Sequence, residues 1–200
     1  MKKLKHEDYL AMREDAEVLE ADPWGDKVLR LTDGTIFKMF RRKRLITSAA
    51  LYPYAQRFAN NAAALEKLGI PVPKVIAVVR IPAISRDAVH YQPLAGTTLR
   101  EMARAGLTPD KKRELKGAFT RFVTGLHDKG VYFRSLHIGN VVCTPEGRLG
   151  LIDFSDLRIH PWPLGKYLRA RNLRRMQGIA DELDWLDCDG VLNSRRPEQA

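Results

Sequence analysis

Hydrophobic and polar residues alternate in three short stretches near the start of the chain, residues 17–22, 27–31 and 35–40. The turn-forming residues Pro23-Trp24-Gly25-Asp26 separate the first two stretches, and Asp33-Gly34 separates the last two. Alternation with a period of two, bounded by turn residues, is typical of antiparallel strands. The pattern therefore predicts a three-stranded meander with Lys38 in its third strand.

A helical spacing follows between Pro53 and Leu68, where the recurring apolar residues are Phe58, Ala62, Leu65 and Leu68. Gly69 comes directly after them and is a plausible end for the helix. Residues 69–84 and 88–94 again resemble strands. Together these segments predict a small five-stranded sheet with one helix.

After Leu94 the pattern becomes mainly helical. Thr108 and Pro109 form a good helix start, Gly130 is a good stop, and one apolar stripe lies between them at Leu115, Ala118, Phe119, Phe122, Val123 and Leu126. We place the boundary near Pro93–Gly96. Residues 1–93 would then form a sheet-plus-helix lobe and residues 94–200 a mostly helical lobe of one functional unit.

The end of the chain alternates between hairpin and helix signals. Residues 141–144 and 149–154 are predicted to be short strands joined by a turn at Pro145-Glu146-Gly147. A basic helical tail follows. Leu183, Trp185 and Leu186 in the acidic and apolar segment after it are expected to belong to a closing helix.

Composition restricts the class of protein. The 200 residues are enough for one domain or two small lobes, and no stretch approaches the roughly 20 apolar residues that span a bilayer. Glu7 and Asp8 stand where a signal peptide would be apolar, so export is not expected. The two cysteines, Cys143 and Cys188, are too few for a disulfide scaffold, which fits a cytoplasmic protein.

The net charge of +10 indicates an anionic partner. A phosphate-bearing substrate, a membrane surface and a nucleic acid are all compatible with it. Basic residues gather in Arg41-Arg42-Lys43-Arg44 and in residues 158–175, where Trp162 and Tyr167 are interleaved. These two basic segments either attract an anionic membrane or glycolipid or form ordinary solvated faces. No helix-turn-helix, zinc or RNA-sheet signature accompanies them, so a nucleic acid is the least supported partner.

Residues 131–156 carry the most informative chemistry. In this stretch a polar loop leads to Asn140, and a hairpin then returns the chain to Asp153. An amide oxygen and a carboxylate that converge from two loops are hard ligands of the kind that Mg²⁺ prefers in phosphoryl transfer. The alternative is structural: Asn140 caps a turn, Asp153 ends a strand and Lys38 is a solvated charge.

The stretch resembles two motifs of protein kinases. Residues 133–140 match the catalytic loop H-R-D-L-x-x-x-N at Arg134, Leu136 and Asn140, and Asp153-Phe154 matches the start of D-F-G. Lys38 matches the strand lysine that holds the α- and β-phosphates. The resemblance implies an α+β, two-lobed protein-kinase-like fold with a minimal helical C-lobe, and it implies ATP and Mg²⁺ as cofactors.

Within that superfamily the chain is similar to small bacterial lipopolysaccharide-kinase-like proteins, some of them called toluene tolerance proteins. The segments that carry this likeness are 26–28, 40–43, 69–73, 132–137 and 150–153. The likeness implies phosphorylation of a lipopolysaccharide core sugar or another anionic glycolipid or sugar-phosphate acceptor, with peripheral contact at the inner membrane. It also implies that Tyr91 lies where kinases hydrogen-bond adenine through backbone groups.

Three departures from the kinase pattern keep a second interpretation open. Ser135 stands at the position of the catalytic aspartate, and His137 or Asp156 would have to replace that base. Asn61 falls where a glutamate should pair with the strand lysine. The glycine-rich loop is reduced to Gly25. The chain is therefore either a phosphotransferase with a degenerate catalytic loop or a pseudokinase that binds nucleotide and acts as a scaffold.

Overall fold

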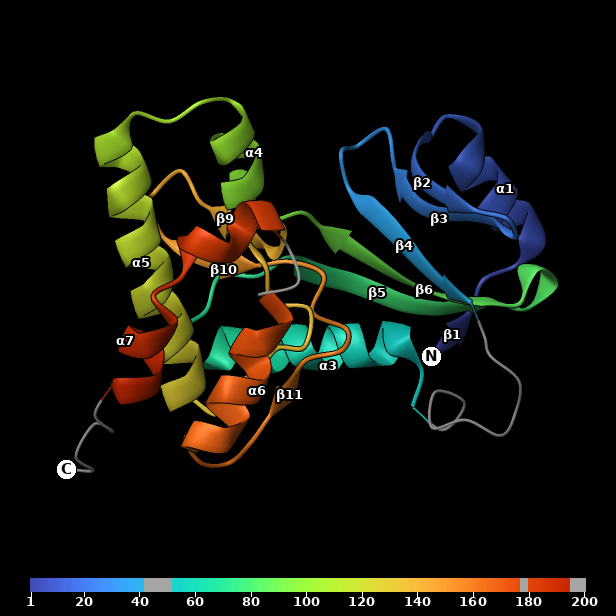
Figure 1. Cartoon of the computed structure of the whole chain (residues 1–200). Helices are drawn as coiled ribbons and strands as arrows, with labels where there is room; N and C mark the ends of the chain where they lie inside the picture. The colour runs from blue at the N-terminus through green and yellow to red at the C-terminus, as the bar shows by residue number, and fades with distance from the viewer. Residues whose placement is uncertain (42–51, 177–179, 195–200) are drawn as a thin grey trace. The chain divides into compact units, whose positions relative to one another are not determined.

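A computed structural model describes residues 1–41, 52–176 and 180–194 of the chain (Figure 1). The structure mixes helices with sheets of mixed strand direction, which confirms the α+β class. The chain divides into two compact units. The first comprises Met1–Lys67 and Val72–Leu94, and the second comprises Leu68–Pro71 and Ala95–Ala200. Arg42, Lys43 and Arg44 of the first basic segment lie outside the described residues.

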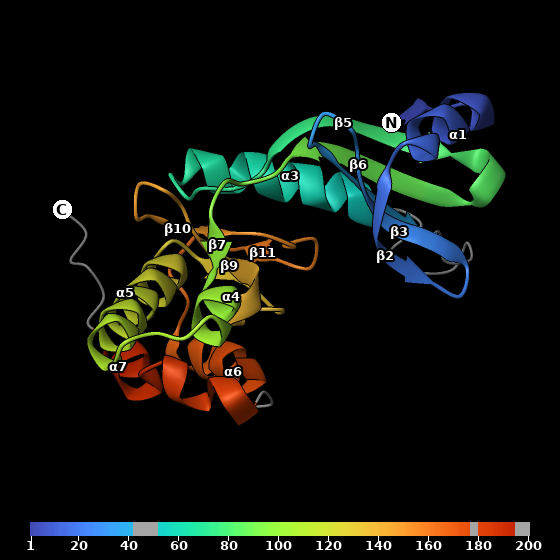
Figure 2. The ribbon, with the colours of Figure 1, turned by 90° about the horizontal axis from the view of Figure 1, so that it is seen from above.

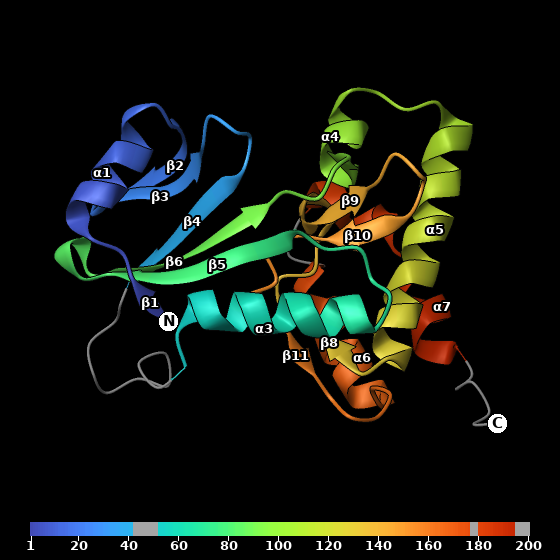
Figure 3. The same cartoon turned by 180° about the vertical axis from the view of Figure 1, so that it is seen from behind.

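A six-stranded sheet forms the centre of the first unit (Figure 3). Its strands, in spatial order, are β1 (Lys2–Lys3), β5 (Lys74–Ile81), β6 (Arg86–Gln92), β4 (Ile36–Arg41), β3 (Gly25–Arg30) and β2 (Glu17–Asp22). The pairing of β1 with β5 is parallel and the other pairings are antiparallel. The predicted meander of β2, β3 and β4 is confirmed.

The first unit differs from the prediction at its N-terminus and along β5. It has six strands because Lys2–Lys3 pairs with β5, and it has an additional helix, α1 (His6–Glu14). Acidic residues in the first turn of α1 and Arg13 in its last turn suit the helix dipole. Strand β5 ends at Ile81 because Pro82 cannot donate to a ladder, and residues 82–84 form a 3₁₀ turn.

The two faces of this sheet carry different helices. Tyr9 of α1 packs with Leu29, Phe37 and Met39 in one buried cluster. The opposite face receives α3 (Tyr54–Lys67), which lies along β5 and β6 in Figure 3 and whose buried residues are Ala55, Phe58, Ala62 and Leu65. This helix confirms the one predicted between Pro53 and Leu68.

The second unit combines short strands with helices (Figure 2). One sheet contains β10 (Leu149–Leu151), β9 (Val141–Cys143) and β7 (Thr97–Thr98), and a second pairs β11 (Arg158–Ile159) with β8 (Val131–Tyr132). Its α-helices are α4 (Leu99–Arg104), α5 (Pro109–Asp128), α6 (Lys166–Met176) and α7 (Cys188–Asn193). The predicted hairpin over residues 141–154 is confirmed as β9–β10.

Helix α5 is the scaffold of the second unit, and it begins and ends as its sequence predicts. Thr108 caps it by accepting a hydrogen bond from the Lys111 amide, Pro109 is the first helical residue, and Gly130 follows its end with a positive φ of 76°. The expected closing helix is a 3₁₀ helix (Ala180–Trp185) followed by α7. Among the helices of the described ranges, none has the length and apolar character that crossing a bilayer requires.

Candidate functional site

Lys38 is placed within the first unit's sheet. It lies in β4 between Val28 of β3 and Val89 of β6, and its Nζ is 5.8 Å from the centroid of the Phe40 ring. Phe40 in turn stacks on Tyr54 of α3. Because side chains alternate along a strand, Lys38 and Phe40 project from the face on which α3 packs.

Asn61, Tyr91 and Gly25 also belong to the first unit. Asn61 is half-buried on α3. Tyr91 ends β6 and stacks on Phe58 of α3, with ring centroids 5.1 Å apart, so its ring has a packing role. Gly25 has a positive φ of 113° and begins β3 after a two-residue turn, so the connection between β2 and β3 is a tight hairpin.

The loop between β8 and β9 positions Asn140 in the second unit. The Asn140 side chain is 8% exposed, and its Nδ2 donates a hydrogen bond of 2.9 Å to the Ser135 carbonyl. Its Oδ1 accepts no hydrogen bond within the described part of the chain. An amide held by its nitrogen in this way presents its oxygen as an acceptor or metal ligand.

The β9–β10 hairpin brings Asp153 to the same end of the sheet as Asn140. Val141 pairs with Leu151, and the Ile152 amide donates a hydrogen bond of 3.0 Å to the Asn140 carbonyl. Asp153 is exposed and has a φ of 52°, a left-handed conformation that is uncommon for residues other than glycine. The next residue, Phe154, is fully buried. Backbone strain of this kind is often found at functional sites.

Asn140 and Asp153 carry an amide oxygen and a carboxylate, which are ligand types that Mg²⁺ accepts. This ion is usually held by one or two carboxylates together with substrate phosphates and water, rather than by a cage of protein ligands. In the described ranges no group of three or more His, Cys, Asp and Glu side chains is arranged to hold a metal. Any Mg²⁺ at this hairpin would therefore need water or phosphate oxygens to complete its coordination.

Ser135 and Asp156 form a close pair. The Ser135 hydroxyl donates a hydrogen bond of 2.7 Å to Asp156 Oδ2. Asp156 Oδ1 is buried and has no hydrogen-bond partner in the described residues. A buried carboxylate oxygen without a partner is costly, which marks this oxygen as a position that a hydrogen-bond donor would stabilise. The fold thus places a carboxylate next to Ser135.

His137 is held by a residue that the sequence reasoning missed. Arg100 of α4 lies with its Nη2 3.2 Å from His137 Nδ1. Because a guanidinium only donates, Nδ1 is the accepting nitrogen and the neutral ring carries its proton on Nε2. Burial lowers the pKa of His137, and the positive charge of Arg100 lowers it further. The lone pair that a general base needs is therefore occupied, so this geometry favours Asp156 over His137.

Arg100 and Glu182 connect the loop to the end of the chain. Arg100 Nε donates to Glu182 Oε1 at 2.7 Å, and the Ile138 amide donates to Glu182 Oε2 at 3.1 Å. Gly139 lies tightly against Arg100, because a Cβ at this position would be 2.5 Å from the guanidinium. In the sequence, Gly139 is a local sign that another group approaches the loop closely. The pairing of Arg100 with Glu182 has no local sign, because the two residues are 82 positions apart.

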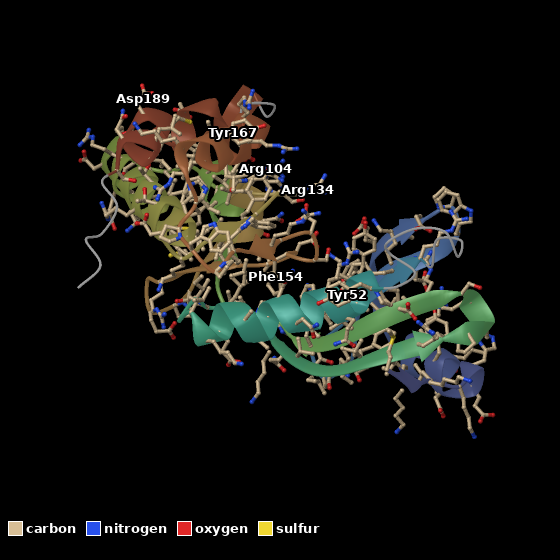
Figure 4. The ribbon with its side chains drawn as sticks, turned by 90° about the horizontal axis from the view of Figure 1, so that it is seen from below. Tyr52, Arg104, Arg134, Phe154, Tyr167 and Asp189 are labelled. Carbon is tan, nitrogen blue, oxygen red and sulfur yellow. The ribbon has the colours of Figure 1, made fainter. Side chains whose placement is uncertain are left out.

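A cavity of about 580 Å³ opens beside this network. Its lining residues are Arg100, Ala103, Arg104, Leu107, Lys112, Ile138, Glu182 and Trp185. The volume falls within the range of about 300–1,000 Å³ that is usual for small-molecule sites. Lys112 is 3.4 Å from Asp184, whereas the Arg104 side chain forms no hydrogen bond or ion pair inside the described ranges. Arg104 is labelled in Figure 4.

Two buried polar side chains, His127 and Asn172, hold the start of this loop. His127 Nε2 lies 3.1 Å from Asn172 Oδ1, and Asn172 Nδ2 donates a hydrogen bond of 2.6 Å to the Phe133 carbonyl. His127 is 1% exposed and its Nδ1 has no partner among the described residues. Burial lowers the pKa of His127 to about 4, so the ring is neutral at pH 7.

The comparisons with known proteins leave the family undetermined. No model of a known protein family matches the chain, and no curated protein matches it.

Proposed function

We propose that this protein is an ATP- and Mg²⁺-dependent phosphotransferase with a two-lobed, protein-kinase-like arrangement. The observation that carries the proposal is the loop geometry of the second unit. There the Ser135–Asp156 pair, the Asn140 amide and the exposed Asp153 all belong to one hydrogen-bonded turn and hairpin. The resemblance of the same residues to kinase motifs supports it independently of the geometry.

The proposed roles follow from the chemistry of each side chain. Asn140 Oδ1 and the Asp153 carboxylate would hold Mg²⁺, which supplies charge neutralisation at the phosphates when it is bound. Lys38 would donate charge-assisted hydrogen bonds to the α- and β-phosphates. Asn61 would orient Lys38 through its side-chain amide, and Gly25 and Tyr91 would contribute through backbone groups near the nucleotide.

Ser135 and Asp156 would move the proton of the acceptor. As the acceptor hydroxyl oxygen bonds to the γ-phosphorus and the bond to ADP breaks, the hydroxyl proton passes to Ser135 Oγ. The serine proton passes at the same time to Asp156 Oδ2, which already accepts it in a hydrogen bond. This relay would replace the missing catalytic aspartate without a role for His137 as base.

The cavity lined by Arg100, Arg104 and Lys112 is the proposed acceptor site. Ile138 lies in its wall and belongs to the catalytic-type loop. Basic side chains select an anionic acceptor, and the cavity volume suits one or two sugar rings. A lipopolysaccharide core sugar or another phosphorylated envelope sugar fits this chemistry, and it would be met by a cytoplasmic protein at the inner membrane surface.

A pseudokinase is the second candidate. Specific observations favour it: Ser135 lacks a carboxylate, and the hairpin at Gly25 is a two-residue turn without a glycine-rich cradle. Such a protein would bind nucleotide and act as a scaffold or regulator.

Thermal shift with ATP and Mg²⁺, followed by transfer of radiolabel to lipopolysaccharide, protein and small-molecule pools, separates the two candidates. Binding with transfer that is lost in Asp153→Asn supports the enzyme. Binding without transfer to any pool supports the pseudokinase. The absence of any nucleotide effect would contradict both.

A further inference from the structure

A second basic concavity lies away from the acceptor cavity, on the β8–β11 sheet of the second unit. Its volume is about 230 Å³, and its lining residues are Tyr132, Arg134, Arg158, His160, Leu168 and Arg171. We call it the arginine pocket. None of its lining residues is acidic, and the volume is below the range of about 300–1,000 Å³ typical of drug-sized ligands. Its size and charge therefore suit a small, highly charged group.

The three arginines of this pocket are not neutralised by the protein. The side chains of Arg134, Arg158 and Arg171 form no hydrogen bond or ion pair in residues 1–41, 52–176 and 180–194, and all three residues are exposed. Other basic side chains of the second unit do have acidic partners, as Lys112 and Lys116 have in Asp184. Three like charges around one concavity repel each other unless an anion is bound.

The backbone around the pocket is firmly built. Arg158 pairs with Tyr132 across the β8–β11 ladder, and the His160 amide donates a hydrogen bond of 2.9 Å to the Gly130 carbonyl. A Cβ at Gly130 would lie 2.2 Å from the His160 carbonyl oxygen, so only glycine permits this approach. Helix α6, which carries Leu168 and Arg171, contacts β8. The arginines therefore project from positions that are held before any ligand arrives.

Two exposed aromatic residues lie close in sequence to residues that line the arginine pocket. Trp162 is 65% exposed and lies two residues after His160, and Tyr167, which is 70% exposed, precedes Leu168 on α6. Figure 4 labels Tyr167 and Arg134, which come from α6 and from the loop after β8. Tryptophan and tyrosine beside cationic side chains are typical of surfaces that contact lipid headgroups.

We propose that the arginine pocket binds a phosphate-monoester group, presented by an anionic lipid headgroup or by a soluble phosphorylated compound. The planar guanidinium of arginine can donate two parallel hydrogen bonds to the oxygens of a phosphate group, and a monoester carries more charge than a phosphodiester. The exposed aromatics favour the lipid as the source. This site is separate from the proposed acceptor cavity and does not depend on catalysis.

The test compares two triple variants of equal charge. The first variant removes the three positive charges of the pocket and consists of Arg134→Gln, Arg158→Gln and Arg171→Gln. The control removes three exposed arginines elsewhere and consists of Arg30→Gln, Arg113→Gln and Arg121→Gln. Titration calorimetry with inorganic pyrophosphate in the presence of EDTA measures the affinity for a soluble compound with terminal phosphate groups. Sedimentation with phosphatidylcholine vesicles that contain phosphatidic acid measures binding to a monoester lipid. Vesicles that contain phosphatidylglycerol measure binding to a diester lipid.

We expect the first triple variant to lose about tenfold or more in affinity for pyrophosphate, for phosphatidic acid vesicles or for both, while the control keeps its affinity. Binding to phosphatidic acid vesicles should also shift the fluorescence of the wild type, and Trp162→Phe should lose that shift. Pyrophosphate binding without vesicle binding assigns the soluble source. Equal losses in both triple variants, equal binding to both kinds of anionic vesicle, or no binding of any probe would overturn the proposal.

Discussion

The Ser135 hydroxyl and the Asp156 carboxylate are joined by a hydrogen bond of 2.7 Å, although the two residues are 21 positions apart. Ser135 belongs to the loop between β8 and β9, and the Asp156 carboxylate reaches it from the segment after Asp153. In the phosphotransferase that we propose, a carboxylate from another segment would thus supply the charge that Ser135 lacks, and Asp156 would act as base.

Substitutions of the pair and of His137 should give opposite results. Asp156→Asn should lower kcat by about 10²–10⁴-fold, the usual contribution of general acid–base catalysis, whereas His137→Gln keeps an acceptor for Arg100 and should change kcat little. Ser135→Asp should lower activity, because it places a second negative charge against Asp156. Radiolabel transfer measures all three. A large loss in His137→Gln, or a gain in Ser135→Asp, would identify a different base.

Asp153→Asn should abolish the Mg²⁺-dependent part of nucleotide binding and leave the fold intact. Asp153 is exposed, and the substitution removes a hard anionic ligand without changing the size of the side chain. Thermal shift with ATP, with and without Mg²⁺, measures the effect. Asp8→Asn, an exposed aspartate on α1, serves as the control. If Asp153→Asn keeps its Mg²⁺-dependent affinity, another residue coordinates the metal.

Lys38→Met should weaken ATP binding by about 1.5–3 kcal/mol, the usual contribution of a hydrogen bond to a charged group. Methionine keeps much of the apolar stem that lies near Phe40, so the sheet should remain folded. Titration calorimetry measures the affinity, and Lys74→Met, an exposed lysine in β5, is the matched control. Equal affinities in wild type and Lys38→Met would show that a different cation binds the phosphates.

Arg100→Met should raise the pKa of His137. The guanidinium lowers that pKa, whereas Glu182 and Asp153 raise it, so removal of Arg100 leaves the raising charges less opposed. A pH titration of the His137 ring by NMR measures the change. Arg104→Met, on the same helix, should leave the His137 pKa unaltered. Identical titration curves for wild type and Arg100→Met would refute the assigned contact.

The buried His127 should make the protein less stable in acid. Its folded pKa of about 4 lies below the unfolded value near 6.5, so the unfolded state binds the proton more readily. The contribution of His127 to the free energy of unfolding is fully present above pH 6.5. It is lost as the pH falls toward 4, by about 3 kcal/mol in total. Urea unfolding at several pH values should therefore show a smaller acid loss in His127→Gln than in wild type. Parallel pH profiles would contradict this.

Much of the local structure follows from the sequence alone. The period-two pattern of residues 17–40 fixes β2, β3 and β4, and the apolar stripes between capping and stop residues determine α3 and α5. Such signals act within a few residues, because propensity, capping and turn geometry are local. Motif spacing also identified Asn140, Asp153 and Ser135 as candidates, and the structure places these three in one loop and hairpin.

Local patterns failed where long-range contacts decide the outcome. Lys2–Lys3 carries little strand signal and becomes β1 only because the edge of β5 accepts it. The role of Glu182 depends on Arg100, and the arginine pocket depends on the pairing of β11 with β8, which brings Arg158 beside Tyr132. A sequence pattern shows which residues can form charge pairs, but the tertiary fold chooses the partners. For this reason the sequence by itself determined β2, β3, β4, α3, α5 and the candidate ligands. Only the tertiary structure decided that β1 joins the sheet, that Ser135 faces Asp156, that Arg100 occupies the lone pair of His137, and which described arginines line a pocket without an acidic partner.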